Sequence, residues 1–211
     1  MPAITSVVTA ARFAQGFTYA DFVAQAAVNQ DKFVANGKTV PLGEQDVAFL
    51  RKAAAHPRGP AKMLALAEAW CGDVYRELPT AARIAEATGM ELRVFLRDQN
   101  LDIMDEFLSN DGKSRAIPVF VFYTKEFEYL THWTERSASA HAGLAAAMKE
   151  AKEKLSLPPS ATFATLPDKD RQALLLELVA RVRPFTDQWR RDAIQEISQL
   201  LANALSIPNA G

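Results

Sequence analysis

The sequence predicts an α/β protein in which a βαβα run is followed by a β-hairpin, with helices before and after it. Short apolar segments typical of buried strands alternate with segments whose apolar residues recur at helical spacing. The last two strand-like segments follow each other too closely for a parallel crossover, so they must form a hairpin. With 211 residues, 49% of them hydrophobic, the chain is large enough for one buried core with added helices.

The segment before the first strand is helical in pattern. The first predicted helix rests on apolar residues at helical spacing: Tyr19, Phe22, Val23, Ala26 and Ala27. A second helix is predicted over 44–55, after a separation at 37–43. The breaker-rich turn at 56–60 ends this region, so we place an N-terminal helical extension at residues 1–57.

The first strand and the first long helix follow that turn. Residues 63–67 are apolar throughout, as expected of a strand buried on both faces, and they run directly toward Cys71. A helix is predicted over 74–88 and stops at Gly89, with a kink expected at Pro79 because proline lacks the N–H and clashes with the preceding turn.

The next five elements complete the sheet and add two helices. Residues 92–96 are predicted as the second strand, and an apolar stripe predicts a helix over 101–108. Residues 117–123 and 127–133 are the hairpin strands. Ser137 then caps a long helix that ends near residue 155.

The C-terminal part follows a linker at 156–160 and contains two amphipathic helices, over 170–182 and 184–205. We therefore assign the sheet domain to 58–155 and a C-terminal helical extension to 160–211. The apolar stripe of these helices is expected to be a packing face, either on the chain's own sheet domain or on a second copy in a homodimer; it comprises Leu174, Leu175, Leu178, Val179, Ile194, Ile197, Leu200 and Leu201.

Charge and cysteine content narrow the function classes. The 24 Lys and Arg residues balance 25 Asp and Glu residues, so the chain lacks the positive field that nonspecific binding to nucleic acid or anionic membranes needs. No stretch approaches the roughly 20 apolar residues of a membrane span. From the charge balance and the lack of such a stretch we expect no nucleic-acid or membrane partner. A single cysteine excludes an intramolecular disulfide, so we also expect a protein of the reducing cytoplasm.

The only cysteine lies at the junction between the first strand and the first long helix, in Ala69-Trp70-Cys71-Gly72-Asp73. This junction, together with Ile117-Pro118 at the start of the third strand and the order of elements from 61 to 155, resembles the thioredoxin fold. The segments Glu68 to Asp73, Arg97-Asp98-Gln99-Asn100 and Trp133-Thr134-Glu135-Arg136 resemble, more narrowly, a bacterial thioredoxin-like subfamily. The resemblance implies a mixed four-stranded sheet and a cis proline at position 118 that lies against the thiol.

Two departures from thioredoxin limit what the resemblance implies about activity. Val74 stands where thioredoxin has its second cysteine, so one chain cannot perform a dithiol cycle. Ala65 stands where thioredoxin has a buried carboxylate, and no internal acid replaces it in the sequence. What remains is monothiol chemistry, in which Cys71 forms a mixed disulfide that a second thiol resolves from solution.

The neighbours of Cys71 have opposing effects on its reactivity. A helix N-terminus lowers a thiol pKa, whereas the carboxylate of Asp73 raises it. Free cysteines are also common as inert core residues, and that interpretation stays open. Trp70 is expected either to offer a flat contact surface beside the thiol or to pack against the sheet.

Four further residues are predicted to bind substrate. Ile117 and Pro118 would present their backbone to an extended peptide or a thiol substrate, because a proline that opens a central strand needs a local reason. Arg115 and Arg136 are expected at the thiol's end of the sheet, where either could stabilise a thiolate or bind a substrate carboxylate. Surface solvation is the alternative for both arginines.

No metal or other cofactor is predicted. The acidic residues between 98 and 106 suit the solvent face and the first turns of a helix, and they lack the spacing of a cation-binding loop. His56, His132 and His141 have no second ligand at short helical spacing.

Two functions from different classes compete. The first is thiol-disulfide exchange through Cys71, with a low-molecular-weight thiol or a protein disulfide as partner. The second is a redox-inactive binding module that keeps the fold and recruits a protein through its groove or its helical extensions. A peroxiredoxin is disfavoured because Glu68 stands where that family has threonine, and a glutathione transferase because its C-terminal helical domain is much longer.

Overall fold

A computed structural model describes residues 6–209 and shows one mixed four-stranded sheet. The strands are β1 (Lys62–Ala67), β2 (Glu91–Leu96), β3 (Val119–Tyr123) and β4 (Tyr129–Thr134), in the spatial order β2-β1-β3-β4. β1 and β2 are parallel, whereas β3 is antiparallel to both β1 and β4. The predicted α/β class and the predicted hairpin are confirmed.

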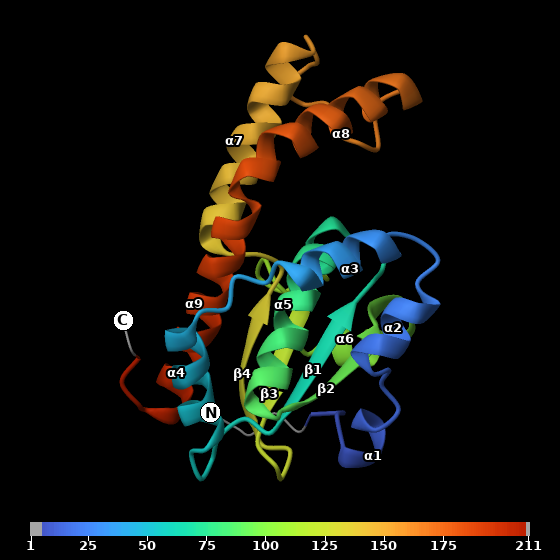
Figure 1. The fold of residues 1–211 in the computed structure, drawn as a ribbon. Helices are drawn as coiled ribbons and strands as arrows, with labels where there is room; N and C mark the ends of the chain where they lie inside the picture. The colour runs from blue at the N-terminus through green and yellow to red at the C-terminus, as the bar shows by residue number, and fades with distance from the viewer. Residues whose placement is uncertain (1–5, 210–211) are drawn as a thin grey trace.

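The β1-to-β2 crossover is the helix α5 (Gly72–Thr88), which lies in front of the sheet in Figure 1. Gly89 ends it in the left-handed conformation, with φ of 77°, which glycine adopts without steric cost. Pro79 lies inside the helix as expected. The observed helix begins two residues earlier than predicted, so that its first turn starts immediately after Cys71.

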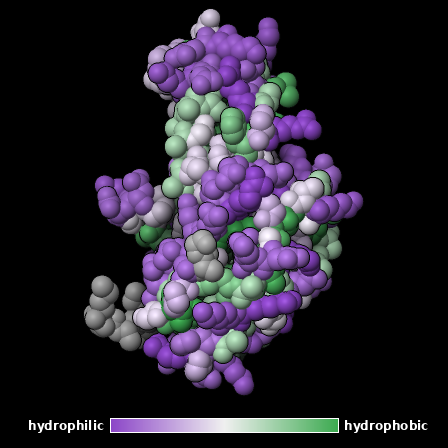
Figure 2. All heavy atoms as spheres, turned by 60° about the vertical axis from the view of Figure 1, so that its left-hand side comes forward, coloured by the Kyte–Doolittle hydropathy of each residue, from purple (hydrophilic) through white to green (hydrophobic). Residues whose placement is uncertain are grey.

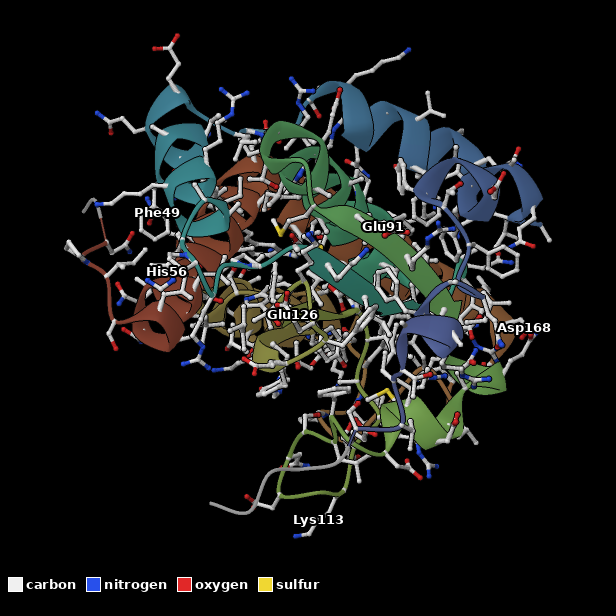
Figure 3. All side chains as sticks on the ribbon, turned by 90° about the horizontal axis from the view of Figure 1, so that it is seen from below. Phe49, His56, Glu91, Lys113, Glu126 and Asp168 are labelled. Atoms are coloured by element: carbon white, nitrogen blue, oxygen red, sulfur yellow. The ribbon has the colours of Figure 1, made fainter. Side chains whose placement is uncertain are left out.

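The segment after β2 is less helical than its apolar stripe indicates. It forms a short 3-10 turn at Arg97–Gln99 and the four-residue helix α6 (Leu101–Met104), behind the sheet in Figure 1. Ile103, Met104 and Phe107 are buried, whereas Leu101 and Leu108 are exposed, so only part of the apolar segment contacts the core. In Figure 3, Lys113 lies at the tip of the loop that follows.

Between residue 6 and β1 the structure shows four helices, not the predicted two. They are α1 (Ala10–Phe13), α2 (Tyr19–Gln25), α3 (Gln30–Lys38) and α4 (Glu44–Ala54). The predicted first helix through Ala27 is wrong at its C-terminal end, because the chain leaves the helical conformation at Ala26 and Asn29 adopts a φ of 62°. α3 was missed because a single buried phenylalanine, Phe33, gives it little periodicity.

The N-terminal helices and the sheet share one hydrophobic core. Their fully or almost fully buried side chains are Phe13, Phe22, Phe33, Phe49, Leu50 and Ala53. The backbone of Phe17 also pairs with Val94 on β2, which extends the sheet edge by one antiparallel bridge. In packing terms residues 6–57 are therefore part of the sheet domain.

The C-terminal part contains α7 (Ala138–Lys154), α8 (Asp168–Val182), a 3-10 turn at Arg183–Phe185 and α9 (Thr186–Leu205). The predicted cap is confirmed, since the Ser137 hydroxyl accepts a hydrogen bond from the amide of Ala140. The predicted division at 155 stays a prediction. It is α9 that packs on β4, α4 and α5, while α7 contacts mainly α8 and α9.

Residues 138–189, which we call the arm, project from the sheet domain at the end where β1 and β4 terminate (Figure 1). The arm has a small core of its own, made of Ala151, Ala161, Leu166 and Leu174. Gly143 lets α7 approach α9 closely, since a Cβ atom there would collide with the Trp189 ring. Figure 2 shows pale and green residues along the arm between its polar tip and the sheet domain.

One buried arginine anchors α9 to the N-terminal helices. The side chain of Arg190 is 0% exposed, and it donates hydrogen bonds to the carbonyl oxygens of Asn36 at 2.7 Å and Thr39 at 3.1 Å. It also donates to the hydroxyl of Thr80 on α5 at 3.3 Å. α4, which carries Phe49 (Figure 3), also packs against α9. The last helix is therefore a structural part of the sheet domain.

None of the helices within residues 6–209 combines the length and the apolar character required to cross a membrane.

Candidate functional site

Cys71 occupies the N-cap position of α5, in the strand-to-helix junction between β1 and α5 that the sequence predicts. It is partly buried, and its Sγ lies 3.7 Å from the carbonyl oxygen of Ile117, to which the thiol can donate a hydrogen bond. The Ile117-Pro118 peptide bond is cis, and both residues are buried. The structure thus brings Cys71, Ile117 and Pro118 together at the same edge of the sheet.

The net effect of this environment is to raise the pKa of the Cys71 thiol. Burial is the largest cause, because it disfavours the thiolate, and the nearby Asp73 carboxylate acts in the same direction. Hydrogen bonds from the backbone amides of Val74 and Asp73 and the charge of Arg136 lower the pKa. The helix start therefore favours the thiolate as expected, but burial outweighs it.

Asp73 is the centre of a charge cluster beside the thiol. Its carboxylate accepts hydrogen bonds from Arg76, one turn along α5, and from Arg136 at 2.5 Å. The side chains of Asp73, Arg76 and Arg136 are only 12–17% exposed. Arg136 also pairs with Glu135 at 2.5 Å. The two arginines balance Asp73, so its carboxylate is not an isolated charge next to the sulfur.

The loop after β4 carries Arg136 to this position. Glu135 adopts a φ of 66°, and its amide donates a 2.7 Å hydrogen bond to the carbonyl oxygen of Pro118. Because Pro118 adjoins the residue that contacts the thiol, this bond fixes the Arg136 loop against the same edge. Of the two predicted arginines, Arg136 is the one that contacts a neighbour of Cys71.

Arg115 has a different partner. Its guanidinium forms a two-bond ion pair with Asp105, at 2.7 and 3.0 Å, and its side chain is 48% exposed. Its carbonyl oxygen accepts a hydrogen bond from Arg97 at 3.0 Å. The backbone at Arg115 thus helps to position the segment before Ile117, and a role for its guanidinium in substrate binding stays a prediction.

Trp70 is 55% exposed, which favours a contact surface over a wedge packed against the sheet. The guanidinium of Arg97 lies 5.3 Å from the centre of its ring, within the range of a cation-π interaction. Asn29 donates a 2.9 Å hydrogen bond to the carbonyl oxygen of Ala69. Asn29 is the N-cap of α3, so the start of this helix holds the segment that leads into Trp70 and Cys71.

Glu68, Asp98 and Asn100, from the motifs that resemble the thioredoxin-like subfamily, form hydrogen bonds around the site. The buried Glu68 accepts a hydrogen bond from the amide of Asp98 at 2.9 Å, which joins the ends of β1 and β2. Asn100 donates to the carbonyl oxygen of Leu96 at 2.8 Å and accepts from Arg12 at 2.8 Å. These contacts give the motif residues a structural role at the thiol's edge of the sheet.

Sequence reasoning missed two ionisable residues on α5 whose environment shifts their pKa. Tyr75 lies one turn after Cys71, and its pKa is raised, mainly by burial. Glu77 is 1% exposed, and burial raises its pKa to about 7 although Arg76 pairs with it at 2.8 Å. Glu77 is therefore a buried acid whose partner is Arg76, and the prediction that no internal acid replaces the carboxylate of thioredoxin stays a prediction. Glu77 belongs to α5, whereas thioredoxin has its acid on the strand, so position-by-position comparison could not find it.

The acidic residues after β2 have protein partners in the structure. Asp98 pairs with Arg97, Asp102 with Arg12 and Asp105 with Arg115, and Glu106 accepts a hydrogen bond from Ser6 at 2.7 Å. Across residues 6–209, no group of three or more His, Cys, Asp or Glu side chains is arranged to bind a metal ion.

Comparison with known proteins agrees with this geometry. The sequence profile of a family described as Thioredoxin matches residues 16–152, which is more than half of the chain. The chain therefore belongs to this thioredoxin-like family. The match includes the N-terminal helices from α2 onward and ends within α7. Comparison with curated proteins gives no match.

Two solved structures share the fold along nearly the whole chain. A protein of unknown function from Pseudomonas aeruginosa, PA1234, is similar with a TM-score of 0.61 and 18% identity, over 93% of this chain and 99% of that one. An HIV epitope-scaffold is similar with a TM-score of 0.60 and 16% identity, over the same shares. At these identities the likeness shows the fold alone.

Proposed function

We propose that this protein performs monothiol thiol-disulfide exchange at Cys71. The observation that carries the proposal is the position of Sγ, between the first amides of α5 and the carbonyl oxygen of Ile117. Cys71 is only partly buried, and in this proposal the backbone of Ile117 offers hydrogen-bonding groups to a substrate that lies beside the sulfur. The single cysteine suits a reducing cytoplasm.

The reaction needs two exchange steps. The Cys71 thiolate attacks one sulfur of a disulfide, a bond forms between the two sulfurs, and the other half of the disulfide leaves as a thiolate. A second thiol from solution, also as its thiolate, then attacks the substrate sulfur of the mixed disulfide and releases the Cys71 thiolate. The electrons lost by the second thiol are those gained by the substrate disulfide.

Four neighbours have assigned roles in this proposal. Arg136 stabilises the thiolate, which competes with the Asp73 carboxylate for the Arg136 guanidinium. Trp70 offers an exposed flat surface to the substrate. Ile117 and Pro118 position the substrate through their backbone. Because burial raises the pKa of the thiol, we expect the rate to increase with pH above neutrality.

The test is mixed-disulfide formation with a small disulfide, hydroxyethyl disulfide, followed by intact mass spectrometry across a pH series. We expect one adduct per folded chain, a rate that rises with pH, and release of the adduct by added cysteine. Cys71→Ser is the blank. If only the denatured protein reacts, Cys71 is an inert buried thiol and the proposal is wrong.

A second function is favoured by the raised pKa of Cys71 together with the exposure of Trp70. In this alternative the protein is a redox-inactive binding module that holds an extended peptide beside Pro118 and Trp70. Peptides selected by phage display on the wild type would then bind Cys71→Ser equally well and would lose affinity for Trp70→Ala. Loss of binding in Cys71→Ser would contradict this alternative.

A further inference from the structure

One face of α8 in the arm is apolar and uncovered. Leu175, Leu176 and Val179 are 51%, 72% and 48% exposed, although the helix buries Leu174 and Leu178 on its other side. Asp168 and Gln172 precede these residues and Arg183 follows them, all exposed and at helical spacing. We call this face the α8 stripe; it comprises Asp168, Gln172, Leu175, Leu176, Val179 and Arg183.

We propose that a second copy of this chain covers the α8 stripe, in a homodimer with antiparallel α8 helices. The order of residues along the stripe carries the inference. It begins with an acid, has two leucines and a valine in its middle, and ends with an arginine. A twofold axis between Leu175 and Leu176 brings every member of the stripe opposite another member.

The charges select the antiparallel arrangement. With the axis in this place, Asp168 faces Arg183 of the second copy at both ends, and Val179 faces Gln172. A parallel pair would instead bring Asp168 next to Asp168 and Arg183 next to Arg183, which repel. The Asp168 side chain is 89% exposed and its one ion pair, to Arg171, is a surface pair of little energy. Within the described part of the chain, Arg183 has no acidic side chain at ion-pair distance.

The area of the stripe determines how strong the dimer is. A helix of 15 residues is about 22 Å long, and one helix pair buries less than the roughly 1,200 Å² in total that stable interfaces usually exceed. We therefore expect a dimer that forms at micromolar concentrations and dissociates on dilution. The arm extends away from the sheet domain (Figure 1), so a second copy can approach it.

The first experiment is sedimentation velocity of the full chain from low micromolar to near-millimolar concentration. We expect the wild type to shift from the monomer mass to twice that mass. Leu176→Glu buries a carboxylate in both halves of the interface, so its dissociation constant should rise on the order of a hundredfold. The matched control is Leu101→Glu, an exposed leucine on α6 that is 41% exposed, which should leave dimerisation unchanged.

A charge exchange tests the register. Asp168→Arg alone and Arg183→Asp alone each place like charges opposite each other and should weaken the dimer roughly tenfold. The double variant restores opposite charges and should recover the wild-type constant, a result that damage to the fold would not produce. Circular dichroism checks that each variant keeps its helix content.

Three outcomes would overturn the proposal: a wild type that stays monomeric at every concentration, a dimer that Leu176→Glu leaves intact, or single charge variants whose defects are not repaired in the double variant.

Discussion

The side chains at the thiol's edge of the sheet and those in the arm differ in how far they are buried and paired within the chain. At the thiol's edge, Asp73, Arg76 and Arg136 are largely buried and paired with one another, and the surrounding helices share one core with the sheet. In the arm, the core is small and one face of α8 leaves its leucines exposed. The charged side chains of the first region pair within one chain, whereas the second region keeps apolar side chains exposed.

Helices of similar composition have different roles in this chain. α8 and α9 both carry apolar stripes, yet Ile194, Ile197 and Leu201 of α9 are buried in the main core while Leu175 and Val179 of α8 are exposed. The difference comes from position, because α9 returns to the sheet and α8 does not (Figure 1). Hence α9 is expected to control folding, and α8 to control association.

The largest effect should come from the anchor of α9. Arg190→Met leaves the carbonyl oxygens of Asn36 and Thr39 without their buried donor, and we expect a loss of about 3–5 kcal/mol of unfolding free energy. Urea denaturation measures it. The control is Arg191→Met, the exposed neighbour, which should stay within about 0.5 kcal/mol of the wild type. Equal effects of the two variants would mean that α9 is not anchored at Arg190.

Substituting one buried leucine in the main core and one in the arm allows the stability of the two cores to be compared. Leu201 in the main core and Leu174 in the arm are both 0% exposed. Leu201→Ala should cost about 3 kcal/mol of global stability. Leu174→Ala should instead speed amide hydrogen exchange in α8 and leave the exchange of β1 and β3 unchanged. If Leu174→Ala also accelerated exchange in the sheet, the arm and the sheet would unfold as one unit.

Glu77 gives the buried charge cluster a pH dependence. Its pKa is raised from 4.5 to about 7 in the folded protein, so the folded state binds a proton that the unfolded state releases between these values. This contribution to stability is fully present below about pH 4.5 and is lost as the pH rises through 7, with a total of up to about 3 kcal/mol.

Glu77→Gln removes this proton. The stability of the variant relative to the wild type should therefore improve as the pH rises from 5 to 8, measured by urea denaturation at each pH. Glu86→Gln, an exposed position on the same helix, is the control. A constant difference between Glu77→Gln and the wild type over this range would contradict the raised pKa.

The smallest effect concerns the thiol itself. Asp73→Asn removes the carboxylate that raises the pKa of Cys71, so alkylation by iodoacetamide at pH 7 should accelerate several-fold. Arg136→Gln removes a positive charge that lowers this pKa and should slow alkylation. Variants of the arm such as Leu176→Glu should leave the rate unchanged. Changes of the same sign in Asp73→Asn and Arg136→Gln would show that packing, not charge, controls the thiol.

The sequence by itself determined the parts that depend on local pattern. The apolar run before Cys71, the stop at Gly89, the hairpin and the cap at Ser137 are encoded within a few residues each, and all four are confirmed. The cis bond at Pro118 followed from the resemblance to thioredoxin. α3 and the four-residue length of α6 did not follow from sequence, because one or two buried side chains give no periodic signal.

Only the tertiary structure decided the contacts between distant residues. It chose Arg136 over Arg115 as the neighbour of Asp73, buried Glu77, and brought α9 rather than α7 onto the sheet. The sequence shows that each of these residues is charged or apolar, but burial and charge pairing depend on which segments meet in space. For the same reason the stripes of α8 and α9 look alike in sequence, and only the fold leaves the stripe of α8 exposed.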